Sequence, residues 1–233
     1  MKTSSGPSHD QDSNPASTDS VSLRVTEIFY SIQGESRFTG NPCVFVRLTG
    51  CPLRCTWCDT EYAFHEGTDL MLQDIVTQVK NFGCQLVEIT GGEPLAQAGA
   101  LPLIQRLCDH GLQVLLETSG AMDVSPVDTR ATIVLDVKCP GSEMSDRMYW
   151  DNLNIISKKD DVKFVIRDRQ DYDWAVEVLH RFKLYDRCTV LFSPVFGELD
   201  LQQLAGWILH DRLAVRFQVQ LHKFIWGPHT RGV

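Results

Sequence analysis

Residues 43–60 read CVFVRLTGCPLRCTWCDT, a short apolar strand that leads into a loop with three cysteines. The spacing of Cys51, Cys55 and Cys58 is C-x3-C-x2-C. Cubane iron–sulfur clusters are held by thiolates, and such close spacing lets one loop reach three irons. Three protein ligands leave the fourth iron open, as a catalytic metal site keeps a vacant position. This stretch therefore predicts a [4Fe–4S] cluster with one iron free to bind a cofactor or substrate.

Two other interpretations of the three cysteines remain open. A structural zinc site would need a fourth ligand, and His65 is the near candidate. Three unrelated core thiols would fit poorly in a polar loop marked by glycine and proline. The scattered Cys84, Cys108 and Cys188 sit near apolar or helical segments and are interpreted as ordinary buried or half-buried thiols.

Outward from this loop, apolar segments of strand type alternate with segments of helical spacing. Such alternation implies an α/β fold with parallel strands joined by right-handed crossovers. A partial barrel and an open doubly wound sheet both fit this pattern. Predicted strands cover 23–30, 43–48, 86–90, 112–117, 132–137, 162–166, 188–192 and 214–221, and predicted helices cover 69–82, 99–110, 171–183 and 200–212.

Polar residues gather where the predicted strands end. The cysteine loop follows strand 43–48, and the segment GGEP at 91–94 follows strand 86–90. Three further strands end in polar residues, at 117–120, 136–138 and 193–194. In a barrel the carboxyl ends of the strands meet at one face, where the chemistry lies. Five loops are therefore predicted to converge on one site.

The composition restricts the classes of function. The chain has 233 residues, 43% of them hydrophobic, and a formal charge of −8. A net negative charge without a Lys/Arg stripe disfavours a nucleic-acid partner. Neither a membrane-length apolar run nor a signal-peptide core is found, so we expect a cytoplasmic protein. Residues 1–20, rich in Ser, Asp and Pro, are predicted to form a disordered tail, and residues 21–233 a single domain.

The cysteine loop and the GGEP segment at 91–94 together resemble the radical S-adenosylmethionine (SAM) superfamily. The resemblance implies a partial (β/α)6 barrel with truncated helices. It also implies that SAM chelates the open iron, and that one electron from the reduced cluster releases a 5′-deoxyadenosyl radical. Glycines in this segment allow close backbone approach, and Glu93 would accept from the SAM ammonium group.

Further segments resemble one family within that superfamily, 7-carboxy-7-deazaguanine synthase. The resemblance implies conversion of 6-carboxy-5,6,7,8-tetrahydropterin to 7-carboxy-7-deazaguanine with loss of ammonia, on the route to queuosine. It implies Mg²⁺ as a cofactor, a homodimer, and an external electron donor such as a flavodoxin or ferredoxin. The segments are IFYSIQGES (28–36), Arg47, CDT (58–60), DVKCPGS (136–142), SPVF (193–196), HK (222–223) and WGP (226–228).

Two rival functions are weighed against this one. Another small radical SAM enzyme, such as a glycyl-radical activase, would share the cysteine loop but would act on a partner protein. The polar set that includes Gln33, Glu35 and Arg47 would then lack a purpose. A zinc-stabilised binding module is the rival outside the enzymes, and it would purify without iron.

The residues suit a pterin chemically. Gln33 offers both a donor and an acceptor, and Glu35 accepts from N–H groups. Arg47 can hold the substrate carboxylate with two bonds, and its place in an apolar strand demands a partner, either Glu35 or a ligand. The substrate-binding residues implied by the resemblance are Ile32, Gln33, Gly34, Glu35, Arg47, Thr90 and Pro228.

The resemblance also implies a metal site and a SAM site. Mg²⁺ prefers oxygen ligands and keeps waters, so the Thr60 hydroxyl with substrate oxygens would serve, with Asp59 as an outer acceptor. A capping residue before a loop is the alternative role of Thr60. The residues predicted along SAM are Trp57, Cys58, Asp59, Gly91, Gly92, Glu93, Lys138, Ser193, Pro194, Val195 and Phe196.

Two features depart from the family's pattern. Ser36 stands where the family usually has glycine, and left-handed backbone would cost serine more than glycine. Residues 229–233 follow Pro228, so a backbone carbonyl would replace the terminal carboxylate of shorter relatives. His222 is weighed both as a site residue and as a hydrogen-bonded strand histidine.

Overall fold

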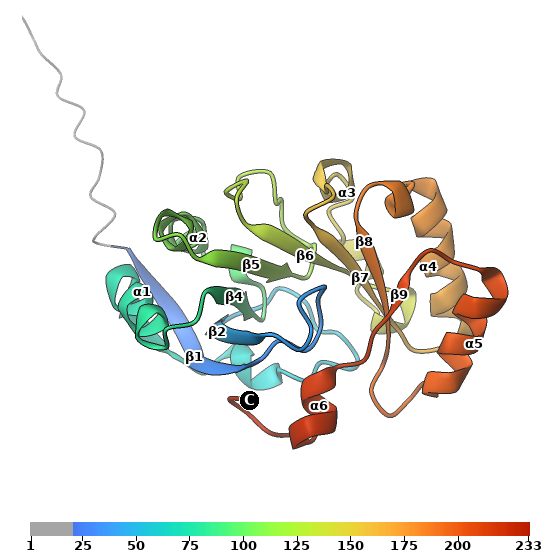
Figure 1. The fold of residues 1–233 in the computed structure, drawn as a ribbon, viewed down its shortest axis with the longest axis horizontal. Coiled ribbons are helices and arrows are strands. Elements are labelled where there is room, and N and C mark those ends of the chain that lie inside the picture. Colours follow the sequence, from blue (N-terminus) through green and yellow to red (C-terminus); the bar gives the residue numbers. More distant parts are fainter. Residues whose placement is uncertain (1–20) are drawn as a thin grey trace, which may run out of the picture.

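The computed structural model describes residues 21–233, so the predicted disordered tail at 1–20 lies outside the described residues. One curved sheet runs through this part in the order β3-β1-β2-β4-β5-β6-β7-β8-β9 (Figure 1). β1 pairs antiparallel with β2 and β3, whereas the neighbours from β2 to β9 are parallel. The strands are β1 (Ser22–Ile32), β2 (Pro42–Leu48), β3 (Thr68–Met71), β4 (Leu86–Gly91), β5 (Gln113–Thr118), β6 (Thr132–Val137), β7 (Asp161–Ile166), β8 (Thr189–Pro194) and β9 (Arg216–Phe217).

Helices cover the outer face of this sheet (Figure 1). Asp168 caps α4 by accepting from the N–H groups of Gln170 and Asp171. Asp200 caps α5 in the same way through Gln203. Between β5 and β6 the described chain has no helix, and between β6 and β7 its only α-helix is the four-residue α3. The helices are α1 (Leu72–Asn81), α2 (Ala100–Asp109), α3 (Asn152–Ile155), α4 (Arg169–Arg181), α5 (Leu201–Asp211) and α6 (Leu221–Trp226).

The sheet stays open, because within the described residues β3 and β9 form its two edges and do not pair with each other. The fold is therefore the partial barrel with truncated helices that the family resemblance implied, of the two folds that the strand pattern allowed. Apolar side chains of the outer sheet face pack with the helices in the main core. A smaller apolar cluster occupies part of the inner face, where alternate residues of the strands point. It consists of Cys43, Phe45, Leu86 and Leu115.

Two segments differ from the prediction, one near each edge of the sheet. Residues 69–71, predicted to begin a helix, form the end of β3 because their backbone pairs with β1. The strand predicted near 214–221 is confined to β9 and is followed by α6. The Gln218 N–H still donates to Phe192 O of β8 at 2.9 Å, and its side-chain amide donates to Ser36 O (2.9 Å) and Thr39 Oγ1 (2.7 Å).

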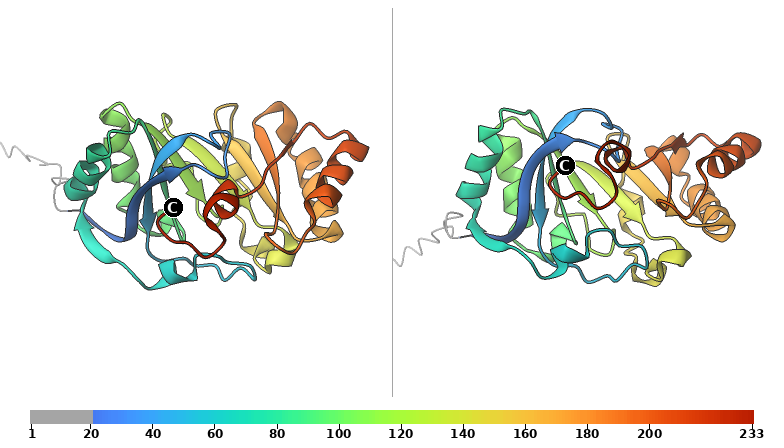
Figure 2. Two further views of the ribbon diagram at one scale, coloured as in Figure 1. Left: turned by 60° about the horizontal axis from the view of Figure 1, so that its bottom comes forward. Right: turned by 90° about the horizontal axis from the view of Figure 1, so that it is seen from below.

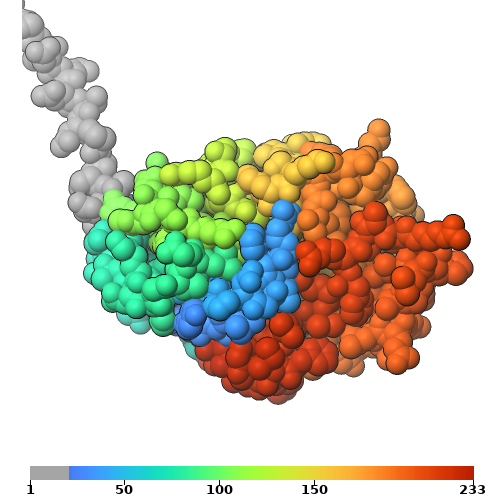
Figure 3. All heavy atoms as spheres, viewed as in Figure 1, coloured from blue at the N-terminus to red at the C-terminus, as the bar shows by residue number. Residues whose placement is uncertain are grey.

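The C-terminal segment returns across the open side of the sheet to β1. Figure 2 shows α6 and the last residues crossing the inner face, and Figure 3 shows their atoms packed against the β1 region. The Leu221 N–H donates to Gly34 O at 3.3 Å. Ser36, in the same loop, is not among the described residues with positive φ, and its hydroxyl accepts from the Phe38 N–H. The backbone cost expected for serine at this position therefore does not arise.

Candidate active site

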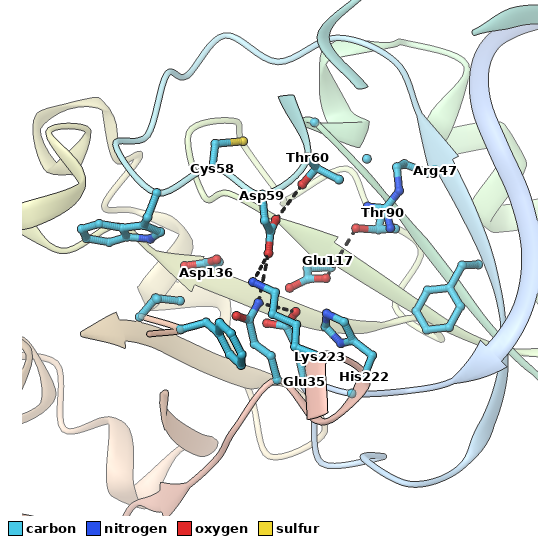
Figure 4. A pocket seen from close by; sticks show the side chains of 18 of the residues that line it. Glu35, Arg47, Cys58, Asp59, Thr60, Thr90, Glu117, Asp136, His222 and Lys223 are labelled. Carbon is cyan, nitrogen blue, oxygen red and sulfur yellow. Dashed lines mark hydrogen bonds and ion pairs between the residues drawn. The ribbon is translucent and has the colours of Figure 1, made fainter. Parts of the chain in front are cut away.

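A pocket of about 730 Å³ opens on the inner face, at the carboxyl ends of the parallel strands. Its wall combines the cysteine loop after β2, inner-face side chains of β4 to β7, and the crossing C-terminal segment. Figure 4 shows side chains from these three parts directed into one space. The convergence that the sequence predicted is therefore present in the structure.

The three clustered cysteines all line this pocket, and none is in a disulfide. Burial raises the pKa of the Cys51, Cys55 and Cys58 thiols, and Lys138 opposes the shift. Binding to iron would therefore have to supply the free energy that deprotonates them. Within residues 21–233 no three His, Cys, Asp or Glu side chains are placed to share one metal ion. A cubane needs no such convergence, because each thiolate binds a different iron.

The glycines after β4 lie tightly against the start of the cysteine loop. A Cβ on Gly92 would lie 2.4 Å from Gly50 O and 2.7 Å from Cys51 Cβ. Gly91 has a φ of 153°, and a Cβ there would lie 2.2 Å from Leu48 O. Only glycine fits at both positions, so close backbone approach, as predicted, holds the two loops together.

Glu93 has a different environment from the glycines that precede it. It is fully buried, and its carboxylate accepts from the Leu95 N–H (3.0 Å), the Thr118 hydroxyl (2.9 Å) and the Ser119 N–H (2.8 Å). These bonds fasten the 91–94 segment to the end of β5. Glu93 does not line the pocket, so its predicted contact with SAM stays a prediction.

The remaining residues predicted along SAM divide into two groups. Ser193 is 2% exposed, and Pro194 lines a neighbouring apolar pocket of about 440 Å³. The Phe196 ring is exposed at the rim and packs edge-to-face with Phe224, with centroids 5.6 Å apart. Those that line the main pocket are Trp57, Cys58, Asp59, Gly91, Gly92, Lys138, Val195 and Phe196.

Lys138 and Asp136 form a buried ion pair beside the cysteines. Lys138 Nζ donates to Asp136 Oδ2 at 2.9 Å. Burial opposes the charge on Lys138, but Asp136 outweighs burial and raises the pKa of the ammonium group. The other oxygen of Asp136, Oδ1, is buried without a hydrogen-bond partner among the described residues. A buried acceptor of this kind fits a ligand with an N–H or O–H group.

Gly34 and Glu35, in the loop that follows β1, contact the C-terminal segment. Glu35 accepts from Lys163 Nζ (2.9 Å) and Gln220 Nε2 (3.0 Å). Burial would raise the pKa of Glu35, but Lys163, His222 and Gln220 outweigh it, so the pKa lies well below its usual range. A Cβ on Gly34 would lie 2.5 Å from His222 Nδ1, so glycine is required for the histidine to pack there. His222 lines the pocket, as its role as a site residue requires.

The partner of Arg47 is a residue that the sequence did not indicate. Arg47 Nε donates to Glu27 Oε1 at 2.7 Å, and the Tyr62 hydroxyl donates to the same oxygen at 2.8 Å. Glu35, the partner considered from the sequence, is instead bound to Lys163. The Arg47 side chain lines the pocket, and its terminal nitrogens remain available to a ligand carboxylate (Figure 4).

Thr60 and Asp59 face the pocket from the end of the cysteine loop. The Thr60 hydroxyl donates to Asp59 Oδ1 at 2.9 Å, and Asp59 Oδ2 pairs with Lys223 Nζ at 2.6 Å. Burial opposes the charge on Asp59, but Lys223 outweighs it and lowers the pKa. Thr60 makes no side-chain cap bond to the 3-10 turn over 61–64. The capping alternative for Thr60 is therefore not supported.

The Gln33 side chain is already occupied. Its Nε2 donates to Glu88 Oε2 at 2.8 Å, and its Oε1 accepts from the N–H groups of Glu35 (2.9 Å) and Ser36 (3.0 Å). Gln33 is only 2% exposed, although it borders the pocket. The other predicted substrate residues, Ile32, Thr90 and Pro228, all line the pocket.

Two buried charged residues of the inner face, Lys163 and Glu88, were not singled out from the sequence. Lys163 Nζ donates to Glu117 Oε1 as well as to Glu35, and it lies 3.3 Å from Asp136 Oδ2. Burial opposes the charge on Lys163, but these carboxylates outweigh it and raise its pKa. The available signal was a charged residue within an apolar strand, as in DVKFVI for Lys163 and LVEIT for Glu88.

Comparison with known proteins agrees with this geometry. The profile of the Radical SAM superfamily matches residues 45–206, which places the chain among radical SAM proteins. Two relatives are named 7-carboxy-7-deazaguanine synthase. The one from Chlorobaculum tepidum is 44% identical over 91% of this chain and 97% of its own length. The one from Koribacter versatilis is 43% identical over 91% of this chain and its whole length. The chain belongs to the 7-carboxy-7-deazaguanine synthase family.

Solved structures support the fold. QueE from Escherichia coli has a TM-score of 0.71 at 22% identity, covering 87% of this chain and 96% of its own. Streptococcus suis SuiB bound to S-adenosylmethionine has a TM-score of 0.51 at 14% identity, covering 73% of this chain and 45% of its own. Among the described residues, no helix combines the length and apolar character that crossing a membrane requires.

Proposed function

We propose that this chain converts 6-carboxy-5,6,7,8-tetrahydropterin to 7-carboxy-7-deazaguanine and ammonia, in the biosynthesis of queuosine. The observation that carries the proposal is that the cysteine loop, Arg47 and Glu35 open on one pocket. A guanidinium suits the substrate carboxylate, and a carboxylate suits its ring N–H groups. The crossing C-terminal segment encloses a site for a small molecule, which favours this reaction over activation of a protein chain.

The pocket also suits the cofactors of the superfamily. Cys51, Cys55 and Cys58 would hold a [4Fe–4S] cluster, and SAM would lie along Gly92 and Lys138. Two observations support this fit: the close approach of Gly92 to the cysteine loop, and the unpartnered Oδ1 of Asp136. When bound, the reduced cluster and SAM supply the one-electron cleavage that begins radical chemistry. Trp57, Val195 and Phe196 would form the apolar wall of this part, with Ser193 and Pro194 behind them.

The residues of the chain bind and orient the substrate. Arg47, held through Nε by Glu27, would direct its terminal nitrogens at the carboxylate. Glu35, kept ionised by Lys163, would accept from pterin N–H groups. Fixing the substrate in this way places the reacting carbon at a defined distance from the cofactor. The walls around the ring would be Ile32, Gly34, Thr90 and Pro228, with Gln33 orienting the loop from behind.

Mg²⁺ is proposed at Thr60. Its hydroxyl already lies 2.9 Å from Asp59 Oδ1, so the pair offers one inner ligand and one outer acceptor. Oxygens of the substrate carboxylate and waters would complete the coordination. Replacing Thr60 with Val should raise the Mg²⁺ concentration needed for half-maximal turnover and leave the iron content unchanged.

The cellular setting is part of the same proposal. We expect a cytoplasmic homodimer that receives its electron from a flavodoxin or ferredoxin. Sedimentation of the reconstituted protein tests the dimer. Turnover with purified flavodoxin and its reductase, in place of dithionite, tests the donor.

Substitution of Arg47 tests the reaction itself. The reconstituted enzyme, supplied anaerobically with SAM, dithionite, Mg²⁺ and the pterin, should release 7-carboxy-7-deazaguanine. Arg47→Lys loses the two-pronged contact and should lower kcat/KM by roughly tenfold to a hundredfold. Cleavage of SAM to 5′-deoxyadenosine without substrate should persist. A wild-type enzyme that cleaves SAM but never alters the pterin would refute the proposal.

A further inference from the structure

Glu88 is a buried carboxyl for which neither the sequence nor the proposed reaction supplies a role. It lies on the inner face of β4 and is 2% exposed. Its register neighbours on both sides are apolar, Phe45 on β2 and Leu115 on β5. Both belong to the apolar cluster on this face. Burial among such groups strongly disfavours an ionised carboxylate.

The charged groups near Glu88 make ionisation still less favourable. Its carboxyl is within hydrogen-bonding reach of Glu117, and Glu35 and the Cys43 thiol are the other titratable groups close to it. Lys163, the nearby cation, is bound to Glu117 and Glu35. Two carboxyl groups in contact without a shared cation hold a proton between them. Burial and the charge of Glu117 accordingly raise the pKa of Glu88 well above its usual range.

The hydrogen bonds around Gln33 show where that proton lies. Gln33 Oε1 accepts from two backbone N–H groups, so Nε2 is the atom that faces Glu88 and must donate. Glu88 Oε2 is therefore an acceptor, and the acid hydrogen belongs on its other oxygen. Glu117 is the acceptor available to that hydrogen.

We propose that Glu88 is a neutral acid that donates a hydrogen bond to Glu117, and that this bond positions Glu117 to accept from the substrate. Lys163 holds Glu117 from the other side. The Glu117 side chain is 21% exposed and reaches the pocket beside Thr90, at 3.4 Å from its hydroxyl (Figure 4). Glu88 is thus a positioning residue, and Gln33 serves the same end by orienting Glu88. The substrate contact of Glu117 rests on the proposed function, whereas the protonation of Glu88 does not.

Two substitutions separate a neutral acid from a charged base. Glu88→Gln keeps a neutral side chain that donates to Glu117 and accepts from Gln33. Glu88→Leu keeps the approximate volume and removes both bonds. We expect Glu88→Gln to retain kcat/KM within about threefold, and Glu88→Leu to raise KM by roughly tenfold to a hundredfold. Glu177→Gln, at an exposed position of α4, is the matched control. Iron content and SAM cleavage without substrate show whether each variant is intact.

An infrared measurement decides the protonation state independently of turnover. The reconstituted wild type should show the carbonyl stretch of a protonated carboxylic acid at neutral pH, where an ordinary Glu is ionised. The band should be lost in Glu88→Gln and kept in Glu177→Gln. Absence of the band at neutral pH, or a Glu88→Gln variant as impaired as Glu88→Leu, would overturn the inference. If the wild type itself does not convert the pterin, the proposed function fails. The infrared result still decides the protonation state of Glu88.

Discussion

The three thiols of the cysteine loop and the charged floor of the pocket face the same space but differ in how many hydrogen bonds they form with the rest of the chain. The floor consists of Glu35, Glu88, Glu117 and Lys163. Each of its side chains has a hydrogen-bond partner within the chain. In the loop the three thiols make only weak contacts with the chain, such as the Leu53 N–H on Cys51 Sγ at 3.4 Å.

This difference follows from the backbone that carries each part. Glu88, Glu117 and Lys163 lie on parallel strands that are fixed by their ladder, so their side chains meet without any ligand. Glu35 reaches Lys163 from the loop after β1. A loop sets the spacing of its thiols, but the thiols have few partners in the chain and would be bound by the metal. Substitutions in the loop should therefore abolish binding of the cofactor. Substitutions in the floor should lower the stability of the protein and its affinity for the substrate.

Loss of a loop cysteine should have the largest effect. Cys55→Ser removes one of three iron ligands, so we expect the cluster, SAM cleavage and pterin turnover to be lost together. Iron and sulfide analysis with the visible absorption spectrum measures this. Cys188→Ser is the control, because this half-buried thiol lies outside the cysteine loop and its Sγ donates to Leu184 O. Retention of a full cluster in Cys55→Ser would contradict the assignment.

Removal of the cation in the floor should come next. Lys163→Met leaves Glu35, Glu117 and Asp136 without their common partner, so we expect a loss of about 3–5 kcal/mol in the free energy of unfolding. Anaerobic urea denaturation of the reconstituted protein measures it. Lys80→Met, at an exposed position of α1, should change stability little. If the two variants were equally stable, Lys163 would not stabilise the protein through its buried carboxylate partners.

The neutral state of Glu88 should appear as a pH dependence of stability. Its pKa is raised on folding by burial and by Glu117, so the stability it contributes is complete below its unfolded pKa and declines as pH rises toward the folded value. Glu88→Gln removes this decline. Its stability relative to wild type should therefore grow with pH above about 4.5, by at most about 1.4 kcal/mol per pH unit. If the difference in the free energy of unfolding between Glu88→Gln and wild type did not change with pH from about 5 to about 8, a raised pKa of Glu88 would be contradicted.

The smallest effect is expected at the rim of the pocket. The Arg231 guanidinium lies 3.7 Å from the centroid of the Tyr62 ring and pairs with Glu66 at 3.1 Å. Arg231 and Glu66 are each 54% exposed, so Arg231→Ala should cost less than about 1 kcal/mol and change KM less than about threefold. Steady-state kinetics against the pterin checks this. A tenfold or larger rise in KM would instead place Arg231 in the substrate-binding site.

Much of the fold was predictable from the chain alone, because its determinants are local. The strand-and-helix alternation after residue 43 survives in the sheet with parallel order from β2 to β9. The errors fall where contacts with distant residues override local spacing. Residues 69–71 pair with β1 as a strand, and the predicted strand at 214–221 is cut short to β9, after which the Gln218 side chain bonds with the 36–39 loop. The hydrophobic periodicity of a segment does not reveal which distant residues it will contact.

The prediction for the cysteine loop likewise came from the sequence alone, since the C-x3-C-x2-C spacing of three thiols within eight residues indicates a cluster ligand set without reference to distant residues. The pairing of the buried charges was decided only by the tertiary structure. Glu27 rather than Glu35 holds Arg47, Gln33 binds Glu88, and Glu117 shares Lys163 with Glu35. The members of each pair lie on different elements, so their contacts exist only once strand register and the crossing C-terminal segment bring them together.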